Sequence, residues 1–283
     1  MPASKSKRAK SARVPAVSPV MSYNKFRLYE QSVQSPDVHV DSFIALYKEI
    51  HRKVPRHLRE DFCGTFQVSC EWVKKNPKNT VIAIDLDQET LDYGKQHHWT
   101  NLTPEQKKRV QIKKANVLTP TTPKIDLIVA CNFSFFIFKE RDLLVKYFKS
   151  CFKSLSQKGS LLLELAGGPG MIASMKERRV IHEGKGSKFT YIWDQISFDP
   201  ITHDADYAIH FKLPSGKIMK NAFTYDWRLW TIPEVRDALA EAGFSKSCVY
   251  WETEHRGKGT GEYTQQEHGD NSFAWIAYVV GSR

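Results

Sequence analysis

The sequence contains no apolar run that approaches the roughly 18 residues needed to span a bilayer. Its 283 residues are 41% hydrophobic and 26% charged, a composition typical of globular proteins. This length allows one large domain, or one domain with an insertion, around a sizeable core. We therefore expect a soluble protein with no membrane partner.

Paired cysteines with metal-binding spacing are also missing. The chain has five cysteines, an odd number, and none forms a Cys-x-x-Cys pair. This pattern argues against a disulfide framework and against a zinc site, so we predict no metal. There is no export signal, and reduced thiols are typical of the cytoplasm, which is the location we expect.

Acidic residues are absent from the first twenty positions. Five of the eleven net positive charges come from this stretch, namely Lys5, Lys7, Arg8, Lys10 and Arg13. A segment rich in Lys, Ser, Ala and Pro cannot bury enough surface to fold alone. We predict a disordered basic tail over residues 1–22, followed by a domain over residues 23–281. A contact between this tail and RNA remains an open alternative to a merely solubilising role.

The sequence also lacks a complete dinucleotide glycine fingerprint, but it carries a related pattern. Residues 57–65 read His-Leu-Arg-Glu-Asp-Phe-Cys-Gly-Thr, and the apolar run of residues 81–84 ends at Asp85. A strand that ends in an acid, a glycine turn, a helix and a second strand that ends in another acid form a βαβ unit suited to a nucleoside. Gly64 lets backbone N–H groups approach the ligand, and Asp85 can accept both ribose hydroxyls.

At these residues the chain resembles the class I S-adenosylmethionine-dependent methyltransferases. Glu60 matches the acid of the family's first motif, Gly64 its middle glycine and Asp85 its ribose-binding acid, while Phe62 and Phe66 replace glycines. The resemblance implies that S-adenosyl-L-methionine is the cofactor. Asn116 stands where the family usually has an acid that contacts adenine, and its carbonyl can accept the same hydrogen bond. The predicted cofactor-binding residues are Glu60, Cys63, Gly64, Thr65, Asp85, Leu86, Asn116, Val117 and Asn132.

The order of predicted elements favours an α/β fold. Two N-terminal helices are expected, the first stopped by Pro36 and the second starting near Val40. Strands and helices then alternate through residue 165, which predicts a doubly wound, mostly parallel sheet. Residues 186–228 predict an antiparallel β insertion after the fifth strand. Two closing strands near residues 245–251 and 271–280, separated by a glycine-rich loop, complete a seven-stranded, Rossmann-like sheet of the methyltransferase type.

Candidate substrate residues lie at predicted strand ends and ahead of the first strand. Ligands collect where the strands of a doubly wound sheet end, which points to Ser134 and Phe135 after the fourth strand. Tyr29, Trp227 and Arg228 are further candidates. Core packing of Tyr29 and a bond between Arg228 and a carboxylate are equally simple explanations for these residues.

The predicted reaction is direct displacement at the sulfonium methyl group by a nitrogen or oxygen, most simply of a small molecule. Such a donor is already activated, so alignment and exclusion of water can supply much of the rate, and no catalytic base is identified. Three alternatives stay open: an RNA-modifying methyltransferase, a nicotinamide-dependent oxidoreductase, and a non-catalytic scaffold whose pocket is filled by Phe62 and Phe66. The sequence leaves the acceptor and the oligomeric state open.

Overall fold

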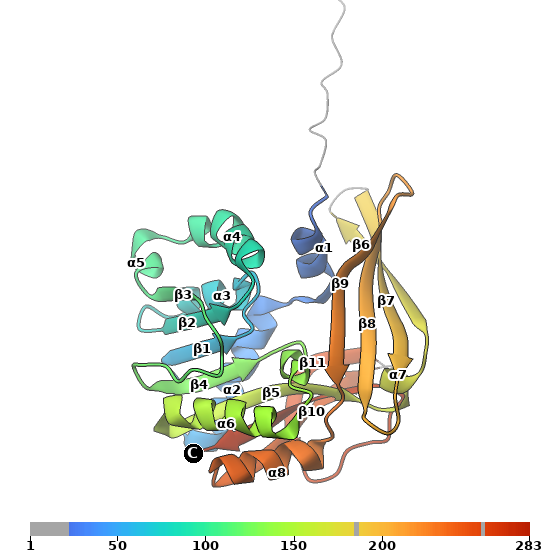
Figure 1. Cartoon of the computed structure of the whole chain (residues 1–283). Helices are drawn as coiled ribbons and strands as arrows, with labels where there is room; N and C mark the ends of the chain where they lie inside the picture. The colour runs from blue at the N-terminus through green and yellow to red at the C-terminus, as the bar shows by residue number, and fades with distance from the viewer. Residues whose placement is uncertain (1–22, 184–186, 256–257) are drawn as a thin grey trace, which may run out of the picture.

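A computed structural model describes residues 23–183, 187–255 and 258–283, so the predicted basic tail lies outside the described residues. Two sheets stand beside each other, and the helix α1 (Lys25–Val33) lies between the second sheet and the helix α4 (Gln88–His97) (Figure 1). Among the described residues, no helix is both long and apolar enough to cross a membrane.

The central sheet has eight strands in the order β11-β10-β12-β5-β4-β1-β2-β3. Five strands run parallel, as predicted: β1 (His57–Asp61), β2 (Thr80–Asp85), β3 (Val110–Lys114), β4 (Ile125–Ala130) and β5 (Leu155–Gly167). The closing strands β10 (Lys246–His255) and β12 (Trp275–Ser282) are antiparallel to each other, and β12 is antiparallel to β5. Parallel strands buried on both faces require continuous apolar sequence, which β2 and β4 supply.

The eighth strand, β11 (Lys258–Gln266), was not expected, because the sequence analysis treats this segment as a loop. Its sequence, KGTGEYTQQ, has no apolar alternation to mark a strand. Backbone pairing along β10, from Val249 opposite Gln266 onward, holds it at the edge of the sheet. The sheet therefore has one more strand than the seven predicted.

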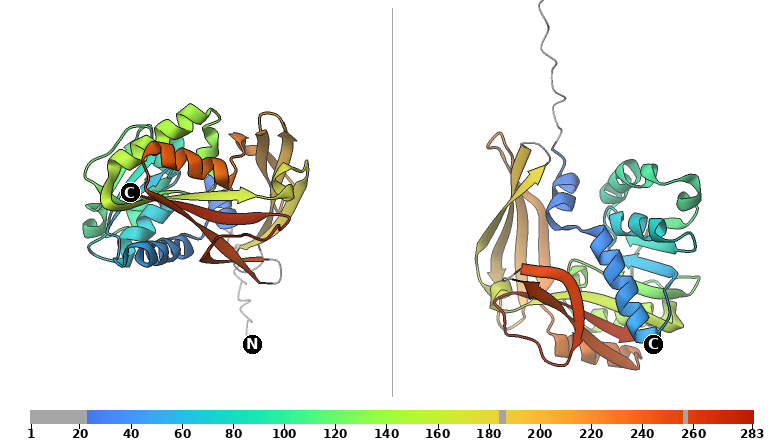
Figure 2. Two further views of the ribbon diagram at one scale, coloured as in Figure 1. Left: turned by 90° about the horizontal axis from the view of Figure 1, so that it is seen from below. Right: turned by 180° about the vertical axis from the view of Figure 1, so that it is seen from behind.

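Helices cover both faces of the central sheet. One face carries α2 (Pro36–His51), α3 (Gln67–Lys75) and α4 (Gln88–His97), and the other carries α6 (Arg141–Ser154) and α8 (Ile232–Ala242). In Figure 2, the view from behind brings α2 to the front. The short elements are η1 (Trp99–Asn101), α5 (Pro104–Lys107), η2 (Ser134–Ile137) and α7 (Pro169–Ile172).

Local sequence fixes several helix ends. Thr231 and Glu234 form a capping box at the start of α8, and Gly243 ends that helix with φ +104°. The first helix ends at Val33, before Pro36, as predicted. The second helix begins at Pro36 itself and not near Val40, because at the first turn the missing N–H of proline costs nothing and its fixed φ suits a helix.

The second sheet is an antiparallel meander of β6 (Lys176–Glu183), β7 (Ser187–Phe198), β8 (Asp204–Lys212) and β9 (Ile218–Arg228). It begins ten residues before the predicted insertion at residue 186, because β6 is a charged edge strand with little apolar signal. Leu28 of α1 is fully buried against Phe189 and Phe211 of this sheet. Phe26 contacts both Tyr93 of α4 and Phe223 of β9, at ring separations of 5.0 and 6.0 Å. The helix α1 therefore links the two layers.

A buried ion pair lies at the centre of the fold. Arg59 of β1 is wholly buried and donates to both oxygens of the Asp61 carboxylate, at 2.6 and 3.1 Å. The same guanidinium donates to the Val117 carbonyl at 2.8 Å and to Ser154 Oγ at 3.1 Å. Tyr147 Oη donates to Asp61 at 2.9 Å. This network joins β1 to α6 and to the turn around residue 117.

Arg59→Met is expected to lower the free energy of unfolding by about 3–5 kcal/mol, because it leaves the buried Asp61 carboxylate without its cation. In Arg59→Met/Asp61→Leu no charge is left unpaired, and most of the loss should be recovered. Urea unfolding of both variants checks this expectation. Equal losses in the single and double variants would contradict it.

Candidate functional site

The loop between β1 and α3 keeps a backbone shape that favours glycine, although two of its residues are phenylalanine. Phe62, Gly64 and Phe66 have φ values of +56°, +54° and +46°. For a bulky residue this conformation costs of order 1 kcal/mol or more. Both rings pack against the core. The centroid of the Phe62 ring lies 5.8 Å from the ring centroids of Phe138 and of Tyr147, and Phe66 is wholly buried.

Asp85 fastens this loop to the end of β2. Its Oδ2 accepts the Gly64 N–H at 2.7 Å, and its Oδ1 accepts the Asp87 N–H at 2.9 Å. The Cys63 N–H also donates to the Ile84 carbonyl, at 2.9 Å. Each carboxylate oxygen has a further lone pair, so Asp85 can accept two hydroxyls while it holds the loop. Beside it, the apolar side chain of Leu86 is 62% exposed.

Glu60 is the buried acid at the end of β1. Its carboxylate accepts the backbone N–H of Ser69 at 2.9 Å and the Ser69 hydroxyl, so it caps the first turn of α3. Burial is the main cause that raises the pKa of Glu60 to about 8; the Ser69 bonds oppose the shift, and Asp85 and Asp61 add to it. A neutral Glu60 at pH 7 is available to ionise when a cation binds nearby.

Replacing Glu60 by Gln should change how stability depends on pH. The unfolded carboxyl titrates near its ordinary value of 4.5, and the folded one at about 8. Between these values the folded state holds a proton that the unfolded state has lost, so the Glu60 contribution to stability falls as pH rises. We expect the stability of Glu60→Gln relative to the parent to increase across this window and to level off above it. Urea unfolding across the window measures this difference, and a constant difference would contradict the assignment.

Three of the other predicted cofactor residues, Cys63, Asn116 and Val117, are either buried or already hydrogen-bonded within the protein. The Cys63 thiol is buried, and burial raises its pKa well above the ordinary value, which does not suit a nucleophile. Asn116 Oδ1 accepts the Leu118 N–H at 2.9 Å, which uses one of its lone pairs, and Val117 is buried. All five cysteines are free and buried.

The helix α1 is fixed over the loop by a residue that the sequence analysis missed. Glu30 is 9% exposed, and its Oε1 accepts the Thr65 hydroxyl at 2.5 Å and lies 2.6 Å from His98 Nε2. Lys25 also pairs with Glu89 of α4 at 2.8 Å. No sequence pattern singled out Glu30, because its partners lie 35 and 68 residues away.

The end of β4, which neighbours β1 in the sheet, has the same unusual backbone. Asn132 and Phe133 have φ values of +53° and +58°. In the described part of the chain, four of the seven non-glycine residues with positive φ lie at these two strand ends. Strained backbone concentrated at adjacent carboxyl ends of parallel strands is typical of a ligand site.

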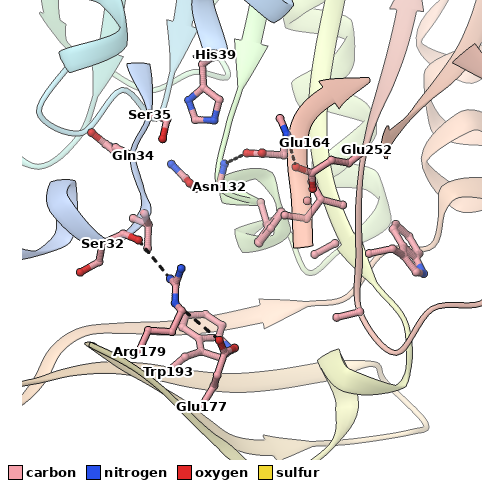
Figure 3. A pocket seen from close by; sticks show the side chains of 18 of the residues that line it. Ser32, Gln34, Ser35, His39, Asn132, Glu164, Glu177, Arg179, Trp193 and Glu252 are labelled. Carbon is pink, nitrogen blue, oxygen red and sulfur yellow. Dashed lines mark hydrogen bonds and ion pairs between the residues drawn. The ribbon is translucent and has the colours of Figure 1, made fainter. Parts of the chain in front are cut away.

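A cavity of about 980 Å³ adjoins this edge (Figure 3). It lies between the end of the central sheet, the junction of α1 with α2, and the second sheet. Of the predicted residues, Tyr29, Asn132 and Trp227 line it. Gly64 and Asp85 lie outside its lining, on the neighbouring strands of the same edge.

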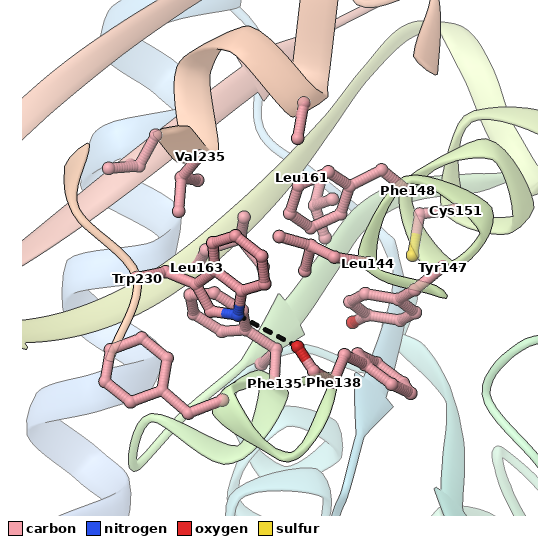
Figure 4. Packing of buried hydrophobic residues seen from close by; sticks show 14 of the residues in the cluster. Phe135, Phe138, Leu144, Tyr147, Phe148, Cys151, Leu161, Leu163, Trp230 and Val235 are labelled. Carbon is pink, nitrogen blue, oxygen red and sulfur yellow. Dashed lines mark hydrogen bonds between the residues drawn. The ribbon is translucent and has the colours of Figure 1, made fainter. Parts of the chain in front are cut away.

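Three predicted substrate residues do not reach the cavity. Phe135 has no exposed surface and packs between the sheet and α6 and α8, where the Trp230 indole N–H donates to the Phe138 carbonyl at 2.9 Å (Figure 4). Ser134 Oγ donates to the Cys131 carbonyl at 2.7 Å. Arg228 donates to the Lys139 carbonyl at 3.1 Å and stacks on Trp230. It also pairs with the Glu234 carboxylate at 3.3 Å, so of the two explanations for Arg228 the bond to a carboxylate is the one found.

The cavity is lined by carboxylates that the sequence analysis did not select: Glu164, Glu177, Glu252 and Glu254. Glu164 offered a signal, since it is a lone acid in the buried apolar run of β5. Glu252 lies on β10, whose neighbouring strand β11 was not predicted. Among the described residues, no group of three or more His, Cys, Asp or Glu side chains is placed to hold a metal ion.

No family model and no curated protein matches the chain. Solved structures match it in fold. An S-adenosylmethionine-dependent methyltransferase of Clostridium acetobutylicum is 16% identical, with 90% of this chain and 96% of that chain covered and a TM-score of 0.64. The sugar N-methyltransferase KedS8 of a Streptoalloteichus species is 14% identical (98% and 99% covered, TM-score 0.63), and the amino pentose methyltransferase CalS10 of Micromonospora echinaspora is 13% identical (93% and 99%, 0.64). The chain therefore has the Rossmann-like α/β fold of these methyltransferases, as predicted.

Proposed function

We propose that the protein transfers a methyl group from S-adenosyl-L-methionine to a nitrogen or oxygen of a small-molecule acceptor. The observation that carries this proposal is the bond from the Gly64 N–H to Asp85. It places a left-handed glycine loop against a second-strand acid in a methyltransferase fold. An adenosine-containing cofactor needs this combination of close backbone approach and a ribose-binding carboxylate.

The chain's residues fit the cofactor. Asp85 has free lone pairs for the two ribose hydroxyls. The exposed Leu86 supplies an apolar surface for adenine, and the bond from the Ala115 N–H to the Asp85 carbonyl, at 3.0 Å, holds the neighbouring Asn116–Val117 turn close by. At the other end, where the methionine part would lie, Gln34 Oε1 is a buried polar atom on the cavity lining that has no hydrogen-bond partner in the described part of the chain. An unpaired buried amide oxygen is costly unless a ligand donates to it.

The bound cofactor supplies an activated sulfonium methyl group. The protein's contribution is to hold the acceptor in line and to exclude water. The helix α1, fastened through Glu30, covers the loop, and Tyr29 and Trp227 line the cavity in which the acceptor would be held. KedS8 is described as a sugar N-methyltransferase and CalS10 as an amino pentose methyltransferase. A cavity of this size can enclose an acceptor as large as a sugar.

Observations weigh against the three alternatives. Phe66 is wholly buried and the Phe62 ring packs against Phe138 and Tyr147, so both rings are engaged by the core, which argues against a cofactor pocket filled by them. Four glutamates around the cavity would repel a polyanion such as RNA. The antiparallel strand β12 beside β5 is not what a dehydrogenase sheet, with a further parallel crossover, would have. A cytoplasmic location remains an expectation from the sequence.

Calorimetric titration of S-adenosylmethionine, S-adenosylhomocysteine and NADH tests the proposal. We expect saturable binding of the first two only. Asp85→Asn keeps one oxygen for the Gly64 N–H, but its amide nitrogen can accept neither the Asp87 N–H nor a ribose hydroxyl, so it should weaken cofactor binding about tenfold or more. Asp92→Ala, which removes an exposed acid from α4, is the matched control and should bind as the parent does.

Parent-like affinity for S-adenosylmethionine in Asp85→Asn would contradict the assigned site. Binding of NADH alone would favour the oxidoreductase alternative. Thermal unfolding of each variant separates a lost contact from a lost fold.

A further inference from the structure

The cavity has a charge opposite to that of the chain as a whole. The protein has a formal net charge of +11, yet among the residues that the structure describes four glutamates and one guanidinium, that of Arg179, line the cavity. Arg179 is already engaged: it lies 3.7 Å from Glu177, stacks over Tyr191 at 4.7 Å and donates to the Ser32 carbonyl at 3.3 Å. An acidic cavity in a basic protein selects for a cationic ligand.

Strand register places two of the glutamates on one face of the central sheet. Glu164 of β5 is opposite Tyr278 of β12, and Tyr278 is opposite Tyr250 of β10. Glu252 is two residues beyond Tyr250, so its side chain points to the same face as that of Glu164. Figure 3 shows both carboxylates directed into the cavity beside Asn132.

Each of these carboxylates accepts a hydrogen bond from one backbone N–H and has further lone pairs with which to bind a ligand. Glu164 is 5% exposed, and its Oε2 accepts the Asn132 N–H at 2.5 Å. Glu252 Oε1 accepts the Gly261 N–H at 2.9 Å. Burial, followed by repulsion from Glu164 and Glu254, raises the pKa of Glu252 against this opposing bond. Within the described residues, no ion pair joins a cation to Glu164 or Glu252.

Buried polar atoms around the pair also lack well-formed hydrogen bonds to the described residues. The hydroxyl of the wholly buried Tyr278 makes no hydrogen bond of normal geometry there; it interacts with the hydroxyl of Tyr263, whose ring lies 4.3 Å away on the cavity lining. His39 Nδ1, also on the lining, has no hydrogen-bond partner among the described residues. Buried polar groups are normally satisfied, so these poorly satisfied atoms indicate a polar ligand at this wall.

The opposite wall is aromatic. The ring centroids of Tyr225 and Trp227 of β9 lie 4.4 Å apart, and the ring centroid of Trp193 of β7 lies 5.7 Å from that of Tyr225. All three rings line the cavity. Ring faces attract cations, most strongly where water is excluded. A nitrogen cation held between carboxylates and rings would satisfy both walls.

We propose that the acceptor is an amine, that it binds as an ammonium ion, and that Glu164 and Glu252 form the subsite that holds it. This inference rests on the proposed methyl transfer and specifies the substrate class for the same site. It also assigns Glu164 and Glu252 the role of acceptor-binding residues.

The transfer step balances as follows for such an acceptor. The bound ammonium first gives one proton to the Glu252 carboxylate. The freed nitrogen lone pair then forms the new N–C bond as the S–C bond breaks, and the bond electrons return to sulfur. The products are S-adenosylhomocysteine and a methylated ammonium ion, and the proton on Glu252 passes to solvent.

Matched ligand pairs test the subsite. With S-adenosylhomocysteine present, thermal shift and calorimetry would compare amines with alcohols of the same carbon skeleton, such as cyclohexylamine with cyclohexanol and glucosamine with glucose. Amines should bind and the alcohols should bind at least tenfold more weakly. Glu164→Gln and Glu252→Gln should each weaken amine binding at least tenfold and leave affinity for S-adenosylhomocysteine unchanged. Glu262→Gln, an exposed acid on β11 that does not line the cavity, is the control.

The outcomes separate the two proposals. If S-adenosylhomocysteine does not bind the parent protein, the proposed function fails. If it binds but no amine is preferred over its alcohol, or both Gln variants bind amines as the parent does, the ammonium subsite is overturned. If Glu164→Gln or Glu252→Gln loses both S-adenosylhomocysteine binding and thermal stability, Glu164→Asp or Glu252→Asp takes its place. The Asp variant keeps the charge and should retain the preference for amines; loss of that preference in a folded Asp variant that still binds S-adenosylhomocysteine would count against the subsite.

Discussion

The hydrogen bond from the Gly64 N–H to Asp85 joins the first two strand ends, and the geometry of the proposed cofactor site depends on it. It holds a loop in which three residues have left-handed backbone, two of them phenylalanines. Because that conformation is unfavourable for Phe, the loop persists only if other interactions fix it. Burial of Phe66, the rings around Phe62 and the Glu30 bond to Thr65 supply that stabilisation.

The buried network of Arg59 and Asp61 explains how the loop after β1 keeps its conformation although phenylalanines replace two glycines of the methyltransferase motif. Arg59 and Asp61 sit directly before Phe62 and connect β1 to α6 and to the turn at Val117. The β1 loop and the 116–118 turn are therefore held by one network. The glycines usually expected in the loop are replaced by phenylalanines whose rings pack against the core.

The sequence predicted the parts of this molecule that local pattern encodes. The alternation of β2, α4 and β3 and the antiparallel closing pair follow from periodicity and turn chemistry. The strand β11 and the start of β6 could not be predicted, because polar edge strands are fixed by backbone pairing with a neighbour. The cavity carboxylates were missed for a related reason: Glu164 and Glu252 lie 88 residues apart and meet only through the register of β12. Phe135, chosen for its place after β4, is core because the short helix η2 turns its ring inward.

We infer that the strained strand ends and the acidic cavity form one methyl-transfer site. A crystal structure of the complex with S-adenosylhomocysteine would test this inference. We expect the ribose hydroxyls on Asp85, adenine against Leu86, and the sulfur facing the cavity beside Asn132. A ligand bound elsewhere, or with its sulfur directed away from Glu164 and Trp227, would contradict it.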